Sequence, residues 1–434
     1  MAKSTNIRWL VFALGCGSSW FLYFHRYIFS LIKPTIAKEW ELSNTELGAV
    51  DSAFAVAYSA CQVPLGLMVD VMGPHFVLTA LLALWSLAIA GHGWAINVTT
   101  LALVRGSFGA FQAGALAALS QVTRRWFPRS SRTICQGWMV VFSARMGGAC
   151  SALIFLYFMM GTLGMSWRIA SYSVAIAGMG MAALIYIFFR NSPREHSRCN
   201  DDEVKLIEAD ADEDETEKVS FGEMIGRVDG RSLLNLFALN LQSTLSTIAD
   251  SVYSLWIPKF LFDEHNLSFK EMGLISSLPL IGGALGGAFG GFLNDLLIKW
   301  TGNRRWARTA VGLAGKMLAG IILLVDILFF YNNPYMFCML LFVVKFVGDW
   351  SLSTGWGTIT DIGGRATASV FAFNNSVAGV GGMLSPVLIG YVADAYTWTH
   401  VFFIIAVIYA LCALSWLSIN CTIPLFGTDD AKEL

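Results

Sequence analysis

Ionisable side chains inside long apolar stretches are the residues of this sequence best placed to do chemistry. A charged group at the centre of a membrane costs about 3 kcal/mol or more, so such side chains are expected to face the protein interior and mark a pathway. The set comprises His25, Arg26, Arg105, Arg145, Asp250, Lys345 and Asp349.

Arg26 is the main candidate for binding an anion. Tyr23 precedes it by three residues and therefore lies on the same helical face. A guanidinium group can hold a carboxylate through two parallel hydrogen bonds, which suits an acidic substrate. The alternative is a structural arginine that pairs with a backbone carbonyl group, with Asp51 or with Asp250.

Arg105 and Gln112 are seven residues apart, which places them two turns apart on one helical face. Gln112 can form hydrogen bonds but cannot take up a proton. Three interpretations of Arg105 stay open: it binds the anion, it attracts the anion from a distance, or it has a structural role.

His25 and Asp250 are candidates for coupling transport to protons. Histidine is the side chain whose ordinary pKa lies nearest to neutral, so His25 could act as a proton-linked switch. The alternative is a neutral histidine bonded to a neighbouring helix. Further along, Lys345, Asp349, Ser353 and Trp356 form one stripe of a helix. We expect Lys345 and Asp349 to pair with each other.

The composition indicates the elements that position these residues. Hydrophobic residues make up 56% of the chain and charged residues only 14%, against about a quarter in soluble proteins. A spanning helix needs about 20 apolar residues. Such windows predict about twelve transmembrane helices, hence an all-α membrane protein, at 9–32, 46–69, 76–95, 99–121, 133–162, 168–189, 232–261, 271–298, 308–330, 334–357, 366–395 and 398–419.

An acidic segment divides these helices into two groups of six. Between Asp201 and Glu217 ten acidic residues stand against one lysine, which is typical of a solvated linker. We predict an N-terminal bundle at 1–190, a cytoplasmic linker at 191–230 and a C-terminal bundle at 231–434. A docking site for a basic partner is the alternative interpretation of the acidic run.

The loops also differ in charge. Lysine and arginine gather after predicted helices 4 and 8 and around the linker, whereas the loops after helices 3, 5, 9 and 11 contain none. Basic loops stay in the cytoplasm. Both termini are therefore expected to be cytoplasmic in a multi-pass protein of the plasma membrane.

Several functions are disfavoured by the sequence. The 29 basic residues are balanced by 30 acidic ones, which leaves no excess of positive charge for nucleic acid. The spacings of catalytic triads and metal ligands do not occur, so we expect no enzyme, no metal and no cofactor. The glycine-rich run at 281–291 lacks the Lys-Ser/Thr of a phosphate loop, and we interpret it as a strip for close helix packing.

One motif occurs twice, at matching places in the two halves of the chain. Gly66 and Asp70 end the second predicted helix, and Gly291 and Asp295 end the eighth with the same spacing. With Gly73, the first copy resembles the signature loop of the major facilitator superfamily, whose two halves are parallel repeats. The resemblance implies that these five residues take part in gating and that the substrate site lies between the halves.

Further motifs resemble the anion:cation symporter family, whose members carry hexuronates, aldonates, glucarate, sialic acid, phosphate or glutamate. They are Ser52-Ala53-Phe54, Arg105-x-x-x-Gly109, Trp126-Phe127-Pro128, Trp167-Arg168 and Trp256-x-Pro258. The resemblance also suggests a bacterial inner membrane. The substrate-binding residues that it implies are Tyr23, Arg26, Tyr58, Arg105, Ser353, Trp356 and Asn375.

The sequence departs from the family at its usual proton carriers. His25 stands where many members have an aspartate, and Gln112 stands where they have a glutamate. The signature loop also lacks its basic residues, because Val71, Pro74 and His75 take their places. Ordinary proton symport is therefore not implied.

We expect a monomeric secondary active transporter of a small organic anion, a sugar acid or related carboxylate, that works by alternating access among membrane lipids. H⁺ or Na⁺ is the expected coupling ion, and His25, Gln112 and Asp250 are the coupling positions. The alternatives are an uncoupled exchanger or facilitator of such anions and a membrane sensor that retains the transporter fold.

Overall fold

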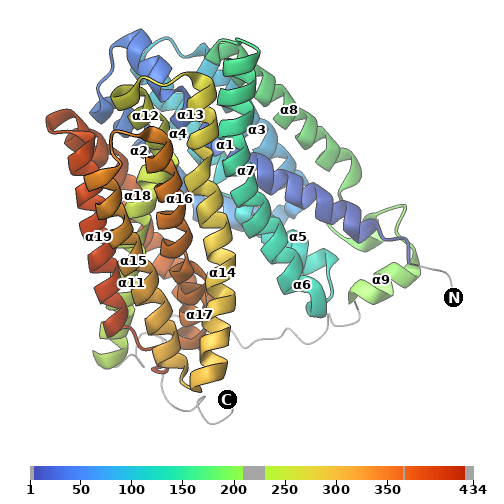
Figure 1. The fold of residues 1–434 in the computed structure, drawn as a ribbon. Coiled ribbons are helices and arrows are strands. Elements are labelled where there is room, and N and C mark those ends of the chain that lie inside the picture. The colour runs from blue at the N-terminus through green and yellow to red at the C-terminus, as the bar shows by residue number, and fades with distance from the viewer. Residues whose placement is uncertain (1–3, 209–229, 365–366, 426–434) are drawn as a thin grey trace. The chain divides into compact units, whose positions relative to one another are not determined.

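The computed structural model describes residues 4–208, 230–364 and 367–425. Within these ranges the chain forms helices and connecting segments without a β-strand (Figure 1). In the same ranges, 11 helices are long and apolar enough to cross a membrane. The prediction of an all-α membrane protein is therefore confirmed.

One predicted span differs from the others in composition. The window at 232–261 corresponds mainly to α11 (Gly230–Leu255), whose 26 residues are enough to cross a bilayer core of about 30 Å. This helix is missing from the 11 apolar ones. It carries Gln242, Ser243, Ser246, Thr247 and Asp250, whose polar side chains lower its hydropathy.

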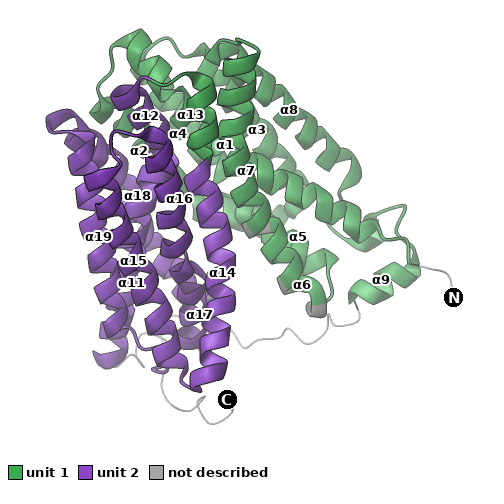
Figure 2. Cartoon of the chain, in the orientation of Figure 1, with its two compact units in different colours: residues 1–216, 267–277 green, residues 217–266, 278–434 purple. Residues whose placement is uncertain are grey.

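The chain folds into two compact units (Figure 2). Unit 1 comprises Met1–Thr216 and Leu267–Ser277, and unit 2 comprises Glu217–Asn266 and Leu278–Leu434. Unit 1 thus includes a short segment from the second half of the chain. In that segment α13 (Phe269–Ile275) packs against the π-helical segment η2 (Ala152–Thr162).

Unit 1 is built from helices that pack in pairs, with α2 against α4, α3 against α8 and α1 against α7. Besides α13 and η2, its elements are α1 (Ile7–Trp40), α2 (Asn44–Met72), α3 (Pro74–Trp94), α4 (Val98–Gln112), α5 (Ala115–Trp126), α6 (Arg129–Gln136), η1 (Gly137–Phe142), α7 (Ser143–Ser151), α8 (Trp167–Phe188), η3 (Pro193–Glu195) and α9 (Asp201–Glu208).

Unit 2 contains α11 and the helices that follow it. In its core α15 packs against α16 and α19, and α11 packs against α18 and α19. The remaining elements are α12 (Ile257–His265), α14 (Ser277–Thr301), α15 (Arg304–Phe329), α16 (Pro334–Gly348), α17 (Trp350–Gly363), α18 (Thr367–Ala395) and α19 (Trp398–Ser418).

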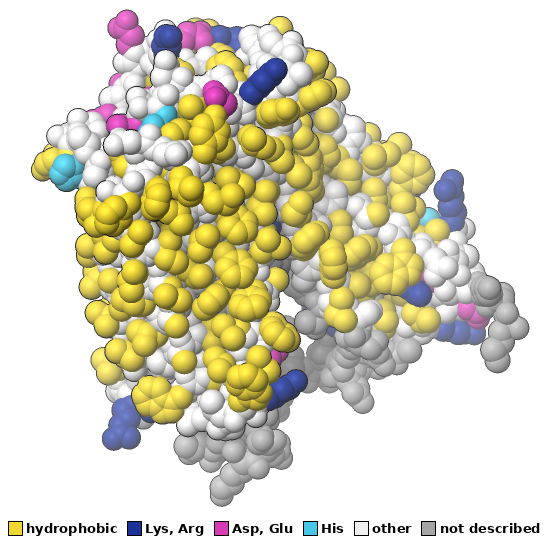
Figure 3. Space-filling view, in the orientation of Figure 1, with side chains coloured by type: hydrophobic (Ala, Val, Ile, Leu, Met, Phe, Trp, Pro, Cys, Tyr) yellow, Lys and Arg dark blue, Asp and Glu magenta, His cyan; other side chains and the backbone are white. Residues whose placement is uncertain are grey.

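Hydrophobic side chains cover the face of unit 2 that Figure 3 shows, and charged side chains gather at the ends of the helices. Among the exposed apolar side chains of unit 2 are Leu285, Phe289 and Phe292 of α14. In water such a surface would be an aggregation hazard, whereas in a bilayer it is the expected lipid-facing surface.

Two helix starts have the same cap in both halves of the chain. The Ser43 hydroxyl accepts a hydrogen bond from the N–H of Glu46, and the Glu46 carboxylate accepts one from the N–H of Ser43. Ser268 and Glu271 repeat this arrangement at α13. Each start is therefore a capping box, which satisfies backbone groups left free by the first turn.

The predicted linker lies partly outside the described residues, which omit 209–229. Its first part contains α9, where Glu203 is buried and accepts hydrogen bonds from the N–H groups of Ile7 and Arg8, each at 3.0 Å. Burial alone would raise the pKa of Glu203, but the hydrogen bonds from Thr5, Arg8 and Ile7 outweigh it and lower the pKa. This carboxylate thereby caps the start of α1.

Candidate functional site

Arg26 of α1 lies in an aromatic cage inside unit 1. Its Cζ is 4.8 Å from the ring centroid of Tyr23, 5.3 Å from that of Phe54 and 4.9 Å from that of Tyr58. Aromatic faces attract a guanidinium group without neutralising its charge. The structure thus brings together three of the predicted substrate-binding residues, Tyr23, Arg26 and Tyr58.

Gln112 is the hydrogen-bond partner of this arginine. Its Oε1 accepts from Arg26 Nε at 3.0 Å, and its Nε2 donates to the carbonyl oxygen of Leu22 at 2.8 Å. Arg26 Nη2 is buried without a hydrogen-bond partner. Among the described residues no acidic side chain forms a salt bridge with Arg26. Its positive charge and a buried donor therefore remain available for an anion.

Arg105 lies in a buried network next to the aromatic cage. Asp51 accepts a hydrogen bond from Arg105 Nη2 at 3.2 Å and lies 2.5 Å from Lys33 Nζ. Arg105 Nη2 is also 3.2 Å from the carbonyl oxygen of Arg26. All three charged side chains of this network are fully or almost fully buried. Arg105 therefore ties α4 to α1 and α2, in keeping with the structural interpretation.

The sequence interpretation missed Lys33, which follows the predicted apolar window at 9–32 and resembles a flanking residue there. Asp51 was considered as a partner for Arg26, whereas in the structure it pairs with Lys33 and Arg105. Lys33 and Arg105 both pair with Asp51, and this arrangement cannot be predicted without knowing which helices pack together.

His25 faces away from the aromatic cage. It is fully buried, and its Nε2 lies 3.1 Å from the carbonyl oxygen of Val174 on α8. A side chain added at Gly178 of α8 would meet the His25 ring. These contacts match the alternative interpretation of a histidine bonded to a neighbouring helix.

Of the predicted gating residues, Asp70 and Gly73 lie at the end of α2, whereas Gly291 and Asp295 lie inside α14, which continues to Thr301 beyond its predicted end. Asp70 of α2 accepts a hydrogen bond from Gln121 of α5 at 2.8 Å. Gly73 joins α2 to α3 with a φ of 80°, which favours glycine. In unit 2, Asn294 donates to the side chain of Asp295 at 3.4 Å.

The other two predicted glycines of the motif differ in their surroundings. A Cβ atom at Gly66 would meet nothing within 4 Å. A Cβ atom at Gly291 would lie 3.4 Å from the Ser353 side chain. Gly291 is therefore part of the contact between α14 and α17.

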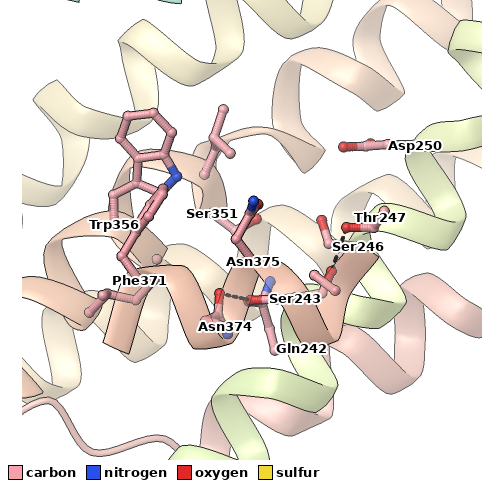
Figure 4. A pocket seen from close by; sticks show the side chains of 14 residues that line it. Gln242, Ser243, Ser246, Thr247, Asp250, Ser351, Trp356, Phe371, Asn374 and Asn375 are labelled. Atoms are coloured by element: carbon pink, nitrogen blue, oxygen red, sulfur yellow. Dashed lines mark hydrogen bonds between the residues drawn. The ribbon is translucent and has the colours of Figure 1, made fainter. Parts of the chain in front are cut away.

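Unit 2 contains a polar cavity of about 150 Å³ between α11, α17 and α18 (Figure 4). Trp356 and Asn375, both predicted to bind substrate, line it. Asn375 lies between aromatic side chains on one side and hydroxyl groups on the other. Ser353 does not line the cavity, because its hydroxyl donates to the carbonyl oxygen of Gly287 at 2.7 Å. The helical spacing of Ser353 and Trp356 does not by itself predict that only Trp356 lines the cavity.

Most other polar residues of this cavity were not singled out from the sequence. Asn374 accepts a hydrogen bond from Ser243 at 3.0 Å and donates to Asn240 at 2.9 Å, so its amide is fixed. Gln242, Ser246 and Thr247 of α11 also line the cavity. Their spacing of about one helical turn in a weakly hydrophobic span was the available signal.

Lys345 connects two acidic side chains next to this cavity. Its Nζ is 2.7 Å from Asp349 Oδ1, which confirms the predicted pair, and 2.5 Å from Asp250 Oδ1. Lys345 and Asp349 are buried, but the Asp250 side chain is 37% exposed and lines the cavity. The contact between Asp250 and Lys345, which joins α11 to α16, cannot be predicted from spacing along one helix.

The fold and these interior polar sites define a multi-pass membrane protein of the kind that handles small solutes. The model of the Major Facilitator Superfamily matches residues 15–360 and 239–425. The chain therefore belongs to this superfamily, as its resemblance implied.

Curated relatives cover nearly the whole chain. A probable sulfoacetate transporter from Cupriavidus necator is 29% identical over 100% of this chain and 98% of that protein. A hexuronate transporter from Escherichia coli is 26% identical over 95% of this chain and 94% of that protein. Both relatives are thus named as transporters of organic acids.

Solved structures share the fold. A bacterial homologue of the human lysosomal transporter Spinster, in an inward-facing and unoccupied conformation, has a TM-score of 0.76 at 16% identity and covers 97% of this chain and 99% of that chain. A D-xylose-proton symporter has a TM-score of 0.72 at 15% identity and covers 95% and 98% of the two chains.

Proposed function

We propose that this protein is a secondary transporter of a small organic anion and that Arg26 holds the acidic group of the substrate. The observation that carries the proposal is the guanidinium group of Arg26, which is caged by aromatic rings and has a buried Nη2 without a partner. An uncompensated charge in such a place is unfavourable unless a ligand satisfies it. The names of the relatives favour a sugar acid or another small acid such as a sulfonated carboxylate.

Each residue of the aromatic cage has a separate role in this proposal. Arg26 binds the carboxylate or sulfonate, and the hydroxyl groups of Tyr23 and Tyr58 offer further hydrogen bonds to it. Gln112 keeps Nε of Arg26 occupied, so the terminal nitrogens face the anion. Arg105 positions this group through the carbonyl oxygen of Arg26 rather than by contact with the substrate.

We propose that the cavity in unit 2 is a second place, within unit 2 alone, at which a polar substrate can bind. Its amide and hydroxyl groups suit a polyhydroxylated chain, and Trp356 and Phe371, whose ring centroids are 5.7 Å apart, supply an apolar wall. Asn375 is the proposed hydrogen-bonding partner of substrate hydroxyl groups. Transport is proposed to follow alternating access, with Gly66, Asp70, Gly73, Gly291 and Asp295 as the gating residues.

Exchange without a coupled ion is the second candidate. It is favoured by Gln112, because the side chain that bonds Arg26 cannot change its charge with pH. In either case, substrate exchange across a membrane without an ion gradient is expected.

Counterflow in proteoliposomes tests the proposal. Vesicles are preloaded with sulfoacetate, glucuronate, galactonate or glucarate, and uptake of the same labelled compound is measured without an ion gradient. At least one acid should exchange, and Arg26→Ala should reduce its exchange by about 100-fold, since a buried charged hydrogen-bond partner contributes roughly 3 kcal/mol.

Arg194→Ala is the matched control, because Arg194 forms an exposed pair with Glu208 and lies far along the chain from the cage. Its exchange should equal that of the wild type. Equal exchange by Arg26→Ala and the wild type would contradict the role of Arg26. Failure of every acid to exchange through correctly inserted protein would favour the sensor alternative.

A further inference from the structure

Asp250, Lys345 and Asp349 form a charged cluster inside unit 2, named here the Lys345 cluster. One ammonium group lies within hydrogen-bonding distance of two carboxylates, at 2.5 Å and 2.7 Å. Lys345 and Asp349 have side chains that are 4% and 3% exposed, while that of Asp250 is 37% exposed. The cluster therefore carries one excess negative charge, and Asp250 is its accessible member.

The cavity beside Asp250 is otherwise lined by neutral side chains. Hydroxyl groups, amides, two aromatic rings and small or aliphatic residues make up the rest of its wall. An anion that enters this cavity meets the charge of Asp250 at short range, and like charges in a poorly hydrated place repel strongly. A protonated Asp250 would instead offer a hydrogen-bond donor.

Protonation of Asp250 would leave no unpaired charge behind. Lys345 keeps its bond to Asp349, four residues further along the chain, and these two buried side chains form a neutral pair. Removing one partner of a buried ion pair is costly when the other charge is left alone. That cost is avoided here because Lys345 has a second carboxylate partner. Asp250 can therefore gain and lose a proton while Lys345 and Asp349 stay paired.

Other titratable groups surround Asp250. Tyr253 lies on the same helix, and Lys345 Nζ is 5.4 Å from its ring centroid. From α15, Lys316 donates to Ser246 at 2.8 Å and Asp326 is buried without a hydrogen-bond partner. From α19, Tyr409 lies under Lys316. Helix α18 contributes the uncharged amides of Asn374 and Asn375.

Lys316 gives the neutralised cavity a preference for anions. Within the described residues no acidic side chain forms a salt bridge with it, and its ammonium group is bonded to Ser246 in the cavity wall. When Asp250 is charged, it offsets this positive charge. When Asp250 is protonated, it no longer offsets the positive charge of Lys316, and the cavity favours a negative ligand.

We propose that Asp250 binds the proton that enters with an anionic substrate and so replaces the carboxylates that are missing at positions 25 and 112. The proton adds to the Asp250 carboxylate, its bond to Lys345 is released, and Lys345 stays paired with Asp349. This proposal rests on the proposed function as an anion transporter. By linkage, the proton strengthens anion binding by the same factor by which the anion strengthens proton binding.

The test measures counterflow of the acid that the wild type exchanges, at about pH 5.5 and about pH 8 on both sides of the membrane. The half-saturating concentration of the wild type should be about tenfold lower at the acidic pH, which is a usual size for coupled sites. Asp250→Asn mimics the protonated residue. Its half-saturating concentration should be low at both pH values and should differ less than twofold between them.

Asp326→Asn is the matched control, because Asp326 is a buried carboxylate of the same unit that does not line the cavity. It should keep the wild-type pH dependence. If Asp250→Asn does not insert, Asp250→Glu serves instead, and it should shift the pH midpoint.

Wild-type pH dependence in Asp250→Asn would overturn the proposal. So would an unchanged midpoint in Asp250→Glu. A wild type that exchanges the acid equally at both pH values would overturn the role of Asp250 but leave anion transport intact. Lack of exchange of every acid would remove the proposed function as well.

Discussion

At the residue scale, the side chain at position 112 is the hydrogen-bond partner of Arg26, the residue proposed to bind the anion. The Gln112 amide occupies one guanidinium nitrogen at 3.0 Å and leaves the positive charge uncompensated. A carboxylate at the same place would neutralise the arginine and compete with the substrate anion, because buried pairs of opposite charge hold each other tightly. In the proposed function, the Gln112 amide therefore leaves Arg26 free to bind an anion at any pH, whereas a carboxylate would have to be protonated first.

Gln112→Glu is expected to introduce pH dependence at the aromatic cage. At neutral pH the new carboxylate should pair with Arg26 and raise the half-saturating substrate concentration by about tenfold or more, which corresponds to roughly 1.4 kcal/mol. Acidification should restore binding as the carboxyl group becomes neutral. Counterflow measured between about pH 5 and about pH 8 checks this, with Asp250→Asn as the background so that only position 112 titrates. A flat profile would contradict the expectation.

At the scale of elements, glycines set the distance between α14 and its neighbours. Cβ atoms at Gly282, Gly286 and Gly290 would collide with backbone atoms of Phe342, Phe346 and Trp350. The predicted packing strip is therefore confirmed for α14 against α16 and α17. Because Lys345 and Asp349 lie at the junction of α16 and α17, this close approach also holds the Lys345 cluster in place.

Gly286→Ala is expected to destabilise unit 2, whereas Gly287→Ala is not. At Gly286 the new methyl group meets the Phe346 backbone, which cannot move aside as a flexible side chain can, and overpacking of this kind costs about 1–3 kcal/mol. At Gly287 the nearest atom is Leu352 Cδ2 at 3.6 Å, an ordinary contact. Thermal unfolding of both variants in detergent checks the difference, and equal melting temperatures would contradict it.

At the scale of the whole molecule, the distribution of basic residues predicts the orientation in the membrane. The segment between α15 and α16 has no lysine or arginine, whereas Lys299, Arg304 and Arg305 flank the junction of α14 and α15. Charged loops of this kind are retained in the cytoplasm. We therefore propose that both termini lie on the cytoplasmic side of a bacterial inner membrane.

A short epitope inserted between Tyr331 and Asn332 should be reached by antibody in spheroplasts without permeabilisation. The same epitope inserted between Gly302 and Asn303 should be reached only after permeabilisation. Both insertions fall in the segments between helices, so the full chain should still insert. The opposite pattern would reverse the proposed orientation.

The sequence by itself determined the helices, their order and the chemistry available to them. Hydropathy and glycine spacing are local properties, so they located the spans, although α1 continues to Trp40, beyond its predicted window at 9–32. Charges within the apolar windows indicated Arg26 and Asp250, and the family resemblance added Gln112 and Trp356. The sequence also predicted the Lys345–Asp349 pair, because residues four apart share a helical face.

Only the tertiary structure decided which charged residues meet. Asp51 pairs with Lys33 and Arg105, and Asp250 lies 2.5 Å from a lysine that is 95 residues away in the sequence. Such contacts depend on which helix faces pack together, and the spacing along one helix carries no information on the rotation of another. For the same reason, helical spacing grouped Ser353 with Trp356, whereas in the structure the Ser353 hydroxyl donates a hydrogen bond to the carbonyl oxygen of Gly287.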